Sequence, residues 1–234
     1  MPLPKAFSVF RTHRTLSIIV AGVVIVAATL AVVLVTRPTA NRDPIPEGSV
    51  VAFYGDSYTF GEQASSPSAR WSTVLSTAQG WDEQNASLNG LGFVANRDGT
   101  DAVQAVIDAE PDLIIVTMGL NDTFIAEAQL DELTTAIHDD LARFRAEAPQ
   151  ARLVVVEPFW IPAAQSPGFA IVADAVKAGA AEVDAEYVAG AGDWLTDHPE
   201  WRSDDQYQHP NDAGYAELAR HMTIELEKLG VIAG

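Results

Sequence analysis

A serine in a glycine-flanked turn is the first residue of the sequence whose setting suggests chemistry. Ser57 lies in the segment GDSYTFG, residues 55–61, directly after the apolar run Ser49–Tyr54. The flanking glycines allow the backbone to turn sharply and to present the hydroxyl group. A serine hydroxyl becomes an effective nucleophile only beside a base that accepts its proton. The segment is not the G-x-S-x-G elbow, because Thr59 stands where that motif requires glycine.

His209 is the histidine that we expect to be this base. It lies in DDQYQHPN, residues 204–211, immediately before a helical pattern. Neutral imidazole accepts a proton near neutral pH and can return it to a leaving alcohol. His198 is the rival base, since it lies near the end of the last expected strand.

Two further residues are of a type that stabilises a negatively charged oxygen. Asn121, in MGLND at residues 118–122, follows an apolar run and carries an amide that donates hydrogen bonds. Gly90, in NASLNGLG at residues 85–92, has a backbone N–H that can donate to an incoming group. Fixed donors aimed at an oxyanion accelerate acyl transfer by roughly two to three orders of magnitude each.

The elements that must position these residues alternate between strand and helix. Short apolar runs rich in β-branched residues predict buried parallel strands at Ser49–Tyr54, Asp112–Met118 and Ala151–Glu157, with weaker signals at Asn85–Leu88 and Glu186–Ala189. Apolar periodicity predicts helices at Asp131–Arg145 and from Asn211 or Asp212 to Lys228, with weaker ones at Ala69–Thr77, Ala102–Ala109 and Ile171–Ala181. This alternation predicts an α/β fold, a three-layer α/β/α sandwich. In such a sheet the loops at the carboxyl ends of the strands hold the chemistry.

The motifs GDS, G-x-N-D and H-P-N occur in this order between about residues 50 and 229. In this order and spacing the sequence resembles the SGNH (GDSL-type) esterase/lipase family. The resemblance implies a flavodoxin-like, five-stranded parallel sheet, with Ser57 as nucleophile, His209 as general base and no metal or cofactor. It also implies three oxyanion donors: the backbone N–H groups of Ser57 and Gly90 and the side-chain amide of Asn121.

The acid that should orient the histidine departs from the family pattern. The family places it three residues before the histidine, as D-x-x-H, but here that position is Gln206. We expect Asp205 to contact the imidazole across one extra residue, with Asp204 or a backbone carbonyl as the alternative. A metal site formed by these two aspartates with His209 and Asp212 is not predicted, because no established metal-ligand spacing accompanies them.

Three tryptophans fall in loops after the fourth and fifth expected strands, near the predicted substrate. They are Trp160, Trp194 and Trp201. Aromatic side chains there can form a platform for a sugar ring or an acyl chain. The alternative is that they pack these loops onto the domain.

The composition excludes several classes of protein. The 234 residues contain no cysteine, which excludes disulfide scaffolds, cysteine-ligated metals and thiol nucleophiles. There are 14 basic and 32 acidic side chains, a net charge that argues against a nucleic-acid partner. Five of the basic residues and one acidic residue lie in residues 1–45, which leaves nine basic and 31 acidic residues for the remainder.

The basic end contains an uncharged stretch of 21 residues, 16–36. At 1.5 Å of rise per residue, a helix of this length spans about 30 Å, the thickness of the hydrocarbon core of a bilayer. We expect a cytoplasmic segment at 1–15, a transmembrane helix at 16–36, a linker at 37–48 and a domain at 49–234. Lys5, Arg11 and Arg14 favour an inside N-terminus and an extracytoplasmic domain in the cell membrane. The alternative is a signal peptide that is cleaved, so that the domain is secreted.

Together these features predict a membrane-attached serine esterase that cleaves carboxylic esters. The surface location suggests O-acetyl or short acyl esters of cell-envelope glycans or lipids as substrates. An acyltransferase that uses the same acyl-enzyme is one alternative. A non-catalytic ligand-binding module with the same fold is another, motivated by the irregular spacing of the acid.

Overall fold

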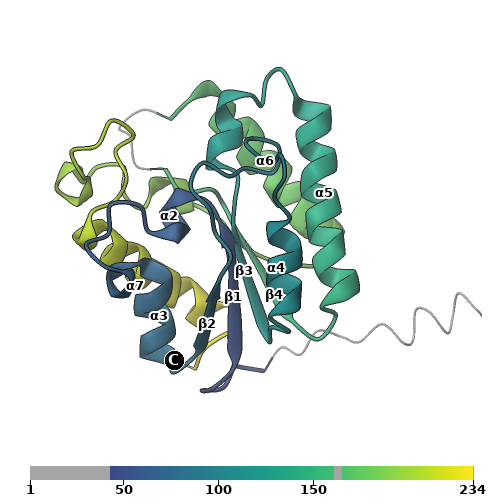
Figure 1. Ribbon diagram of the computed structural model, residues 1–234, viewed down its shortest axis with the longest axis vertical. Coiled ribbons are helices and arrows are strands. Elements are labelled where there is room, and N and C mark those ends of the chain that lie inside the picture. Colours follow the sequence, from purple (N-terminus) through teal and green to yellow (C-terminus); the bar gives the residue numbers. More distant parts are fainter. Residues whose placement is uncertain (1–42, 161–164, 234) are drawn as a thin grey trace, which may run out of the picture. The chain divides into compact units, whose positions relative to one another are not determined.

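The computed structural model describes residues 43–160 and 165–233 (Figure 1). The predicted cytoplasmic segment and transmembrane helix, with the first part of the linker, lie outside these residues. Within the described ranges, no helix is both long enough and apolar enough to cross a bilayer.

A five-stranded parallel sheet forms the centre of the domain. The strands are β1 (Val50–Gly55), β2 (Asp82–Asn85), β3 (Leu113–Thr117), β4 (Arg152–Val156) and β5 (Glu186–Val188), in the spatial order β2-β1-β3-β4-β5. This is the strand order of flavodoxin-like sheets. The α/β fold class and the parallel sheet are thus confirmed.

Helices cover both faces of the sheet (Figure 1). On one face lie α3 (Trp71–Gln79) and α7 (Asp212–Lys228), and on the other lie α4 (Ala102–Asp108), α5 (Leu130–Glu147) and α6 (Pro167–Glu182). Successive side chains of a strand point to opposite faces. Accordingly Val51 and Phe53 of β1 belong to the first core, whereas Ala52 and Tyr54 belong to the second.

The second strand lies three residues earlier than the sequence indicates. The prediction was Asn85–Leu88, but β2 has the sequence DEQN and is a partly exposed edge strand that pairs with β1 alone. An edge strand with polar residues on both faces carries no apolar signal. The helix at 171–181 also starts earlier, at Pro167, because proline suits the first helical turn.

The chain turns directly from β1 into a short helix, α2 (Ser57–Phe60). Asp56 caps this helix by accepting the Tyr58 backbone N–H at 3.0 Å, and Gly61 ends it in a left-handed conformation. Gly55 permits the close packing beneath, because a Cβ there would lie 2.4 Å from Thr117 Oγ1. The carboxyl end of β1 therefore places Ser57 above the sheet edge.

Both ends of the described domain lie at the edge of the sheet where the strands begin, opposite the edge that carries Ser57. The Ile45 N–H donates to the Val231 carbonyl at 2.7 Å. The buried Arg152 donates to the carbonyls of Leu229 and Gly230 at 2.7 and 2.8 Å and forms a bidentate ion pair with Glu186. These contacts fasten the two ends at the amino edge, away from Ser57.

Candidate active site

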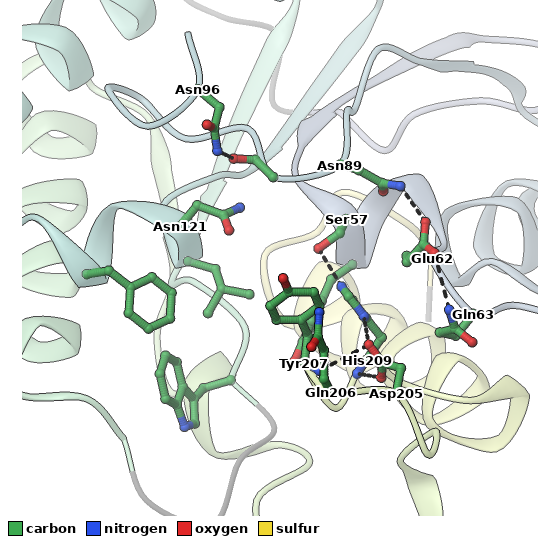
Figure 2. Close-up of a pocket in the computed structure, with 15 residues that line it drawn as sticks. Ser57, Glu62, Gln63, Asn89, Asn96, Asn121, Asp205, Gln206, Tyr207 and His209 are labelled. Carbon is green, nitrogen blue, oxygen red and sulfur yellow. Dashed lines mark hydrogen bonds and ion pairs between the residues drawn. The ribbon is translucent and has the colours of Figure 1, made fainter.

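Ser57, His209 and Asp205 form a continuous hydrogen-bonded chain (Figure 2). The His209 Nε2 lies 3.0 Å from the Ser57 Oγ, and its Nδ1 lies 2.7 Å from an Asp205 carboxylate oxygen. Ser57 is 6% exposed and His209 8%. In this arrangement the imidazole can take the serine proton at Nε2 while the carboxylate holds the N–H at Nδ1.

Residues 203–211, which we call the histidine loop, bring Asp205 rather than Asp204 to the imidazole. Asp205 also accepts the backbone N–H groups of His209 and Tyr207, at 2.8 and 3.2 Å, while Asp204 is exposed. Gln208 adopts a left-handed backbone conformation, with φ of 56°, which accommodates the extra residue between acid and base. The four-residue spacing is therefore compatible with an oriented histidine.

The environment of Asp205 keeps its carboxylate ionised. Partial burial raises its pKa, but hydrogen bonds from the Ser203 hydroxyl and from the ring and backbone of His209 outweigh this effect and lower the pKa to about 2. An ionised carboxylate at Nδ1 favours the imidazolium ion that forms when the serine proton is transferred.

Donors for an oxyanion lie around Ser57. Within the described part of the chain, the backbone N–H groups of Ser57 and Gly90 have no acceptor, and both residues line the pocket. Asn121 uses one amide N–H to bind the Leu91 carbonyl at 2.9 Å, which leaves the other available. Figure 2 shows Asn121 and Ser57 facing the same space. The three residues that the resemblance implied as oxyanion donors therefore line one pocket.

Asp122 fastens residues 86–97, which we call the oxyanion loop because they contain Gly90. Its fully buried carboxylate accepts the backbone N–H groups of Phe93, Val94 and Ala95 at 2.7, 2.9 and 3.0 Å. Burial raises the pKa of Asp122, although these three N–H groups act in the opposite direction. Asn121 and Asp122 are adjacent, so one turn of chain carries a predicted oxyanion donor and holds the loop that contains Gly90.

A second cluster fastens the same loop from the side of α5. Arg97 forms a bidentate ion pair with Asp140, at 2.7 and 2.8 Å, and donates to the Tyr54 hydroxyl at 2.6 Å. Tyr54 donates in turn to Asp140 at 2.6 Å. These contacts join β1, the oxyanion loop and α5. Sequence reasoning missed Asp122 and this cluster, because their partners are distant in the chain.

A pocket of about 730 Å³ surrounds Ser57. It is lined by Ser57, Tyr58, Glu62, Gln63, Asn89, Gly90, Asn96, Leu120, Asn121, Phe124, Trp160, Asp205, Gln206, Tyr207 and His209. No lysine or arginine is among these lining residues. An anionic substrate would therefore meet no lysine or arginine among the described residues that line the pocket.

Of the three tryptophans that the sequence places near the substrate, only Trp160 lines this pocket. Trp194 stacks on His221, with ring centroids 5.0 Å apart, and Trp201 stacks on His198 at 3.6 Å. These stacks correct the prediction for Trp194 and Trp201, which pack their loops instead. His198 bonds to Glu200 at 2.8 Å, so the rival base is engaged elsewhere.

Two exposed aromatic residues that sequence reasoning missed do line the pocket. Phe124 lies at the end of the 3-10 helix Leu120–Phe124, and Tyr207 lies in the histidine loop. Each is within three residues of a predicted site residue, a signal that could have identified them.

In the described ranges, no group of three or more acidic or histidine side chains could hold a metal ion. Asp212 instead bonds to the backbone and hydroxyl of Ser65.

Comparison with known proteins identifies relatives over most of the chain. The sequence model of the GDSL-like lipase/acylhydrolase family matches residues 53–217. A GDSL lipase of Mycobacterium tuberculosis is 30% identical over 203 residues, which cover 77% of this chain and 83% of that protein.

Solved structures of esterases share the fold. A catalytic mutant of an acetylxylan esterase from Geobacillus stearothermophilus has a TM-score of 0.58 and 20% identity, covering 81% of this chain and 99% of that chain. A family two carbohydrate esterase from Clostridium thermocellum, in complex with cellohexaose, has a TM-score of 0.63 and 16% identity. The match covers 81% of this chain and 67% of that chain. At these identities the likeness supports the fold alone.

Proposed function

Since the chain belongs to the GDSL-like lipase/acylhydrolase family, we propose that it hydrolyses carboxylic esters with Ser57 as nucleophile and His209 as general base. The observation that carries the proposal is the continuous contact from Asp205 through His209 to Ser57, at 2.7 and 3.0 Å, beside unused backbone donors. This contact also accommodates the irregular spacing of the acid. That spacing was the reason to consider a non-catalytic module as the alternative.

The reaction follows from these positions. The Ser57 Oγ attacks the ester carbonyl carbon while His209 Nε2 takes its proton. The carbonyl oxygen becomes negative and accepts hydrogen bonds from the Ser57 and Gly90 N–H groups and the Asn121 amide. His209 then protonates the leaving alcohol, and the C–O bond breaks to give an acyl-enzyme. Water, deprotonated by His209, releases the acid and restores Ser57.

We further propose that the substrate is a short acyl ester of a neutral alcohol, such as an O-acetyl group on a cell-envelope glycan. The absence of lysine and arginine from the described lining of the pocket supports a neutral substrate. Structural neighbours that act on acetylxylan, or that hold cellohexaose, support a sugar as the alcohol.

The proposed location is the outer surface of the cell membrane, with residues 16–36 as the anchor. The supporting observations are the uncharged 21-residue stretch and the basic residues that precede it. A chain cleaved after this stretch would be secreted, and the mass of the mature protein distinguishes the two outcomes.

Hydrolysis of p-nitrophenyl acetate, butyrate and octanoate by the full-length chain in detergent tests the proposal. We expect Ser57→Ala to reduce kcat by at least about four orders of magnitude, since the nucleophile is removed. Ser68→Ala, an exposed serine outside the pocket, is the matched control. Undiminished turnover by Ser57→Ala would contradict the proposal. Product analysis with a sugar acceptor present separates hydrolysis from acyl transfer.

A further inference from the structure

The most exposed large hydrophobic side chains of the described domain are two aromatic rings at the active-site pocket. Four large hydrophobic residues are conspicuously exposed in the described ranges: Leu88, Phe124, Leu130 and Tyr207. Phe124 and Tyr207 are the most exposed, at 72% and 68%, and they are the two that line the pocket. Single exposed apolar residues are ordinary on protein surfaces. Two flat rings at the mouth of one pocket instead indicate a surface that contacts a ligand.

The position of Tyr207 assigns it to the alcohol part of the substrate. Its ring lies edge-on to the His209 ring, with centroids 6.0 Å apart and an interplanar angle of 72°. His209 must protonate the oxygen of the leaving alcohol, so the alcohol has to lie beside this imidazole during the reaction. A group bound next to His209 on this side therefore contacts Tyr207.

Phe124 lines the same pocket from the chain segment that carries Asn121. It follows the oxyanion donor Asn121 by three residues, at the end of the same 3-10 helix. With 72% of its surface exposed, Phe124 cannot enclose an acyl chain, which needs apolar contact on several sides. An open ring of this kind offers one face to a flat partner.

Most of the remaining lining side chains are polar and suit hydroxyl groups, whereas Leu120 and Trp160 are apolar. Five are amides: Gln63, Asn89, Asn96, Asn121 and Gln206. An amide both donates and accepts, as a hydroxyl does. Glu62 adds a carboxylate acceptor, which is held by the side chains of Asn89 and Gln63. Figure 2 shows Glu62, Gln63 and Asn89 together on one side of Ser57.

A sugar chain matches this combination better than a lipid surface does. A pyranose ring has apolar C–H faces that stack on aromatic rings, and hydroxyl groups at its edge that bind amides and carboxylates. Residues 46–234 carry nine basic and 31 acidic side chains, a balance that repels an anionic bilayer. In addition, amide and carboxylate side chains line the pocket together with the two rings and the apolar Leu120 and Trp160.

We propose that Tyr207 and Phe124 are stacking surfaces for neighbouring pyranose rings of a neutral acylated oligosaccharide, with the ester-bearing ring on Tyr207. Gln63, Asn89, Gln206 and Glu62 bind its hydroxyl groups. This inference rests on the proposed esterase function and identifies its substrate class as a glycan chain rather than a lipid or a free small ester.

The test compares two esters in the full-length chain. The probes are partially O-acetylated xylo-oligosaccharides of about four sugars and ethyl acetate, whose alcohol has no ring. We expect Tyr207→Ala to lower the ratio of their kcat/KM values 10–100-fold, mainly through the KM of the oligosaccharide, and Phe124→Ala to lower it about tenfold. Tyr207→Phe, which keeps the ring, should hold the ratio within about threefold. Leu130→Ala is the control, since Leu130 is exposed but does not line the pocket.

An unchanged ratio in Tyr207→Ala and Phe124→Ala would overturn the inference, as would an equal fall in Leu130→Ala. A preference of the wild-type chain for diacylglycerol in neutral vesicles, reduced by these two variants, would assign the rings to lipid instead.

A second experiment measures binding and does not depend on turnover. In the Ser57→Ala background, calorimetry measures the binding of unacetylated xylotetraose. Binding that Tyr207→Ala weakens about tenfold or more supports the sugar surface even if no ester is cleaved. If the chain cleaves esters but this binding is absent or insensitive to Tyr207, the inference fails while the esterase function stands.

Discussion

The histidine loop and the oxyanion loop are each organised by one aspartate, but the two carboxylates lie in opposite environments. Asp205 is partly exposed and binds groups no more than four residues away, and its pKa is lowered to about 2. Asp122 is fully buried and binds backbone N–H groups 27 to 29 residues away, and burial raises its pKa.

From this difference we infer that Asp205 serves mainly catalysis, whereas Asp122 serves mainly the stability of the fold. The bonds of Asp205 belong to one loop, so their loss should disable the base and should cost less stability than the loss of the Asp122 bonds. The bonds of Asp122 join the end of β3 to the chain after β2, so their loss should loosen the domain and the oxyanion hole together. Four substitutions or titrations test this division, in order of decreasing effect.

Removal of the Asp205 carboxylate should have the largest effect. We expect Asp205→Ala to lower kcat by about 10³–10⁴, because the imidazole loses the partner that fixes its tautomer and stabilises its charged form. Steady-state kinetics with p-nitrophenyl acetate measure this change. Asp204→Ala, the exposed neighbour, is the control and should stay within twofold of wild type. Comparable losses in both variants would show that the loop, rather than the Asp205 contact, is what matters.

Removal of the Asp122 carboxylate should reduce both stability and turnover. Asp122→Ala leaves one buried and two partly buried N–H groups without an acceptor, and we expect the free energy of unfolding to fall by on the order of 3–5 kcal/mol. At a temperature where the variant is folded, kcat should fall about 10–100-fold with little change in KM, because Gly90 is no longer held. Urea unfolding and kinetics give the two quantities, with Asp139→Ala on the exposed face of α5 as the control. Full stability with reduced kcat would refute the architectural role.

The two carboxylates should also respond to pH with opposite signs. A lowered pKa means that Asp205 stabilises the fold above its ordinary value near 3.8, and that this stabilisation is lost as the pH falls from about 4 to about 2. The contribution is on the order of 2 kcal/mol at neutral pH. A raised pKa means that protonation of Asp122 favours the fold, so its contribution declines as the pH rises.

Thermal unfolding of wild type and Asp205→Asn at pH 7, 4 and 2.5 measures the first of these effects. The difference in Tm should be present at pH 7 and should shrink towards pH 2.5. A difference that is constant across this range would contradict the assignment, and Asp204→Asn serves as the control.

The smallest effect should come from a single hydrogen bond within the oxyanion loop. Asn96 donates to the Gly90 carbonyl at 2.7 Å and has a φ of 54°, which glycine tolerates. Asn96→Gly should lower kcat about three- to fivefold and change stability by less than about 1 kcal/mol. Glu110→Gly is a matched control, because Glu110 is exposed, has a φ of 50° and lies outside the pocket. An equal loss of activity in both variants would show that the introduction of a glycine, rather than the loss of the hydrogen bond to Gly90, causes the effect.

The two loops also differ in how far the sequence could predict them. Ser57, Asn121 and His209 follow strand ends or precede a helix, so the topology of a parallel sheet brings them together. Asp205 was within reach of the same reasoning because it lies four residues from the base. Asp122 could not be identified in this way, because the N–H groups that it binds become its neighbours only when the sheet has formed.

The aromatic residues show the same limit. Trp194 and Trp201 carry a strong compositional signal, yet both stack on histidine rings and neither lines the pocket. Phe124 and Tyr207 carry a weaker signal, and their exposure at the pocket depends on the conformation of the loops around them. Residue type indicates that an aromatic surface is possible, but the packing of each ring decides where it lies.

The hydrogen bond between Ile45 and Val231 has a practical consequence for engineering. With the two ends of the domain side by side at the amino edge of the sheet, a short peptide could join them and new termini could be opened in a surface loop. Such circular permutants are tolerated where the original ends are adjacent. The same adjacency allows the domain to be inserted into a loop of a host protein, with the edge that bears Ser57 pointing away from the graft.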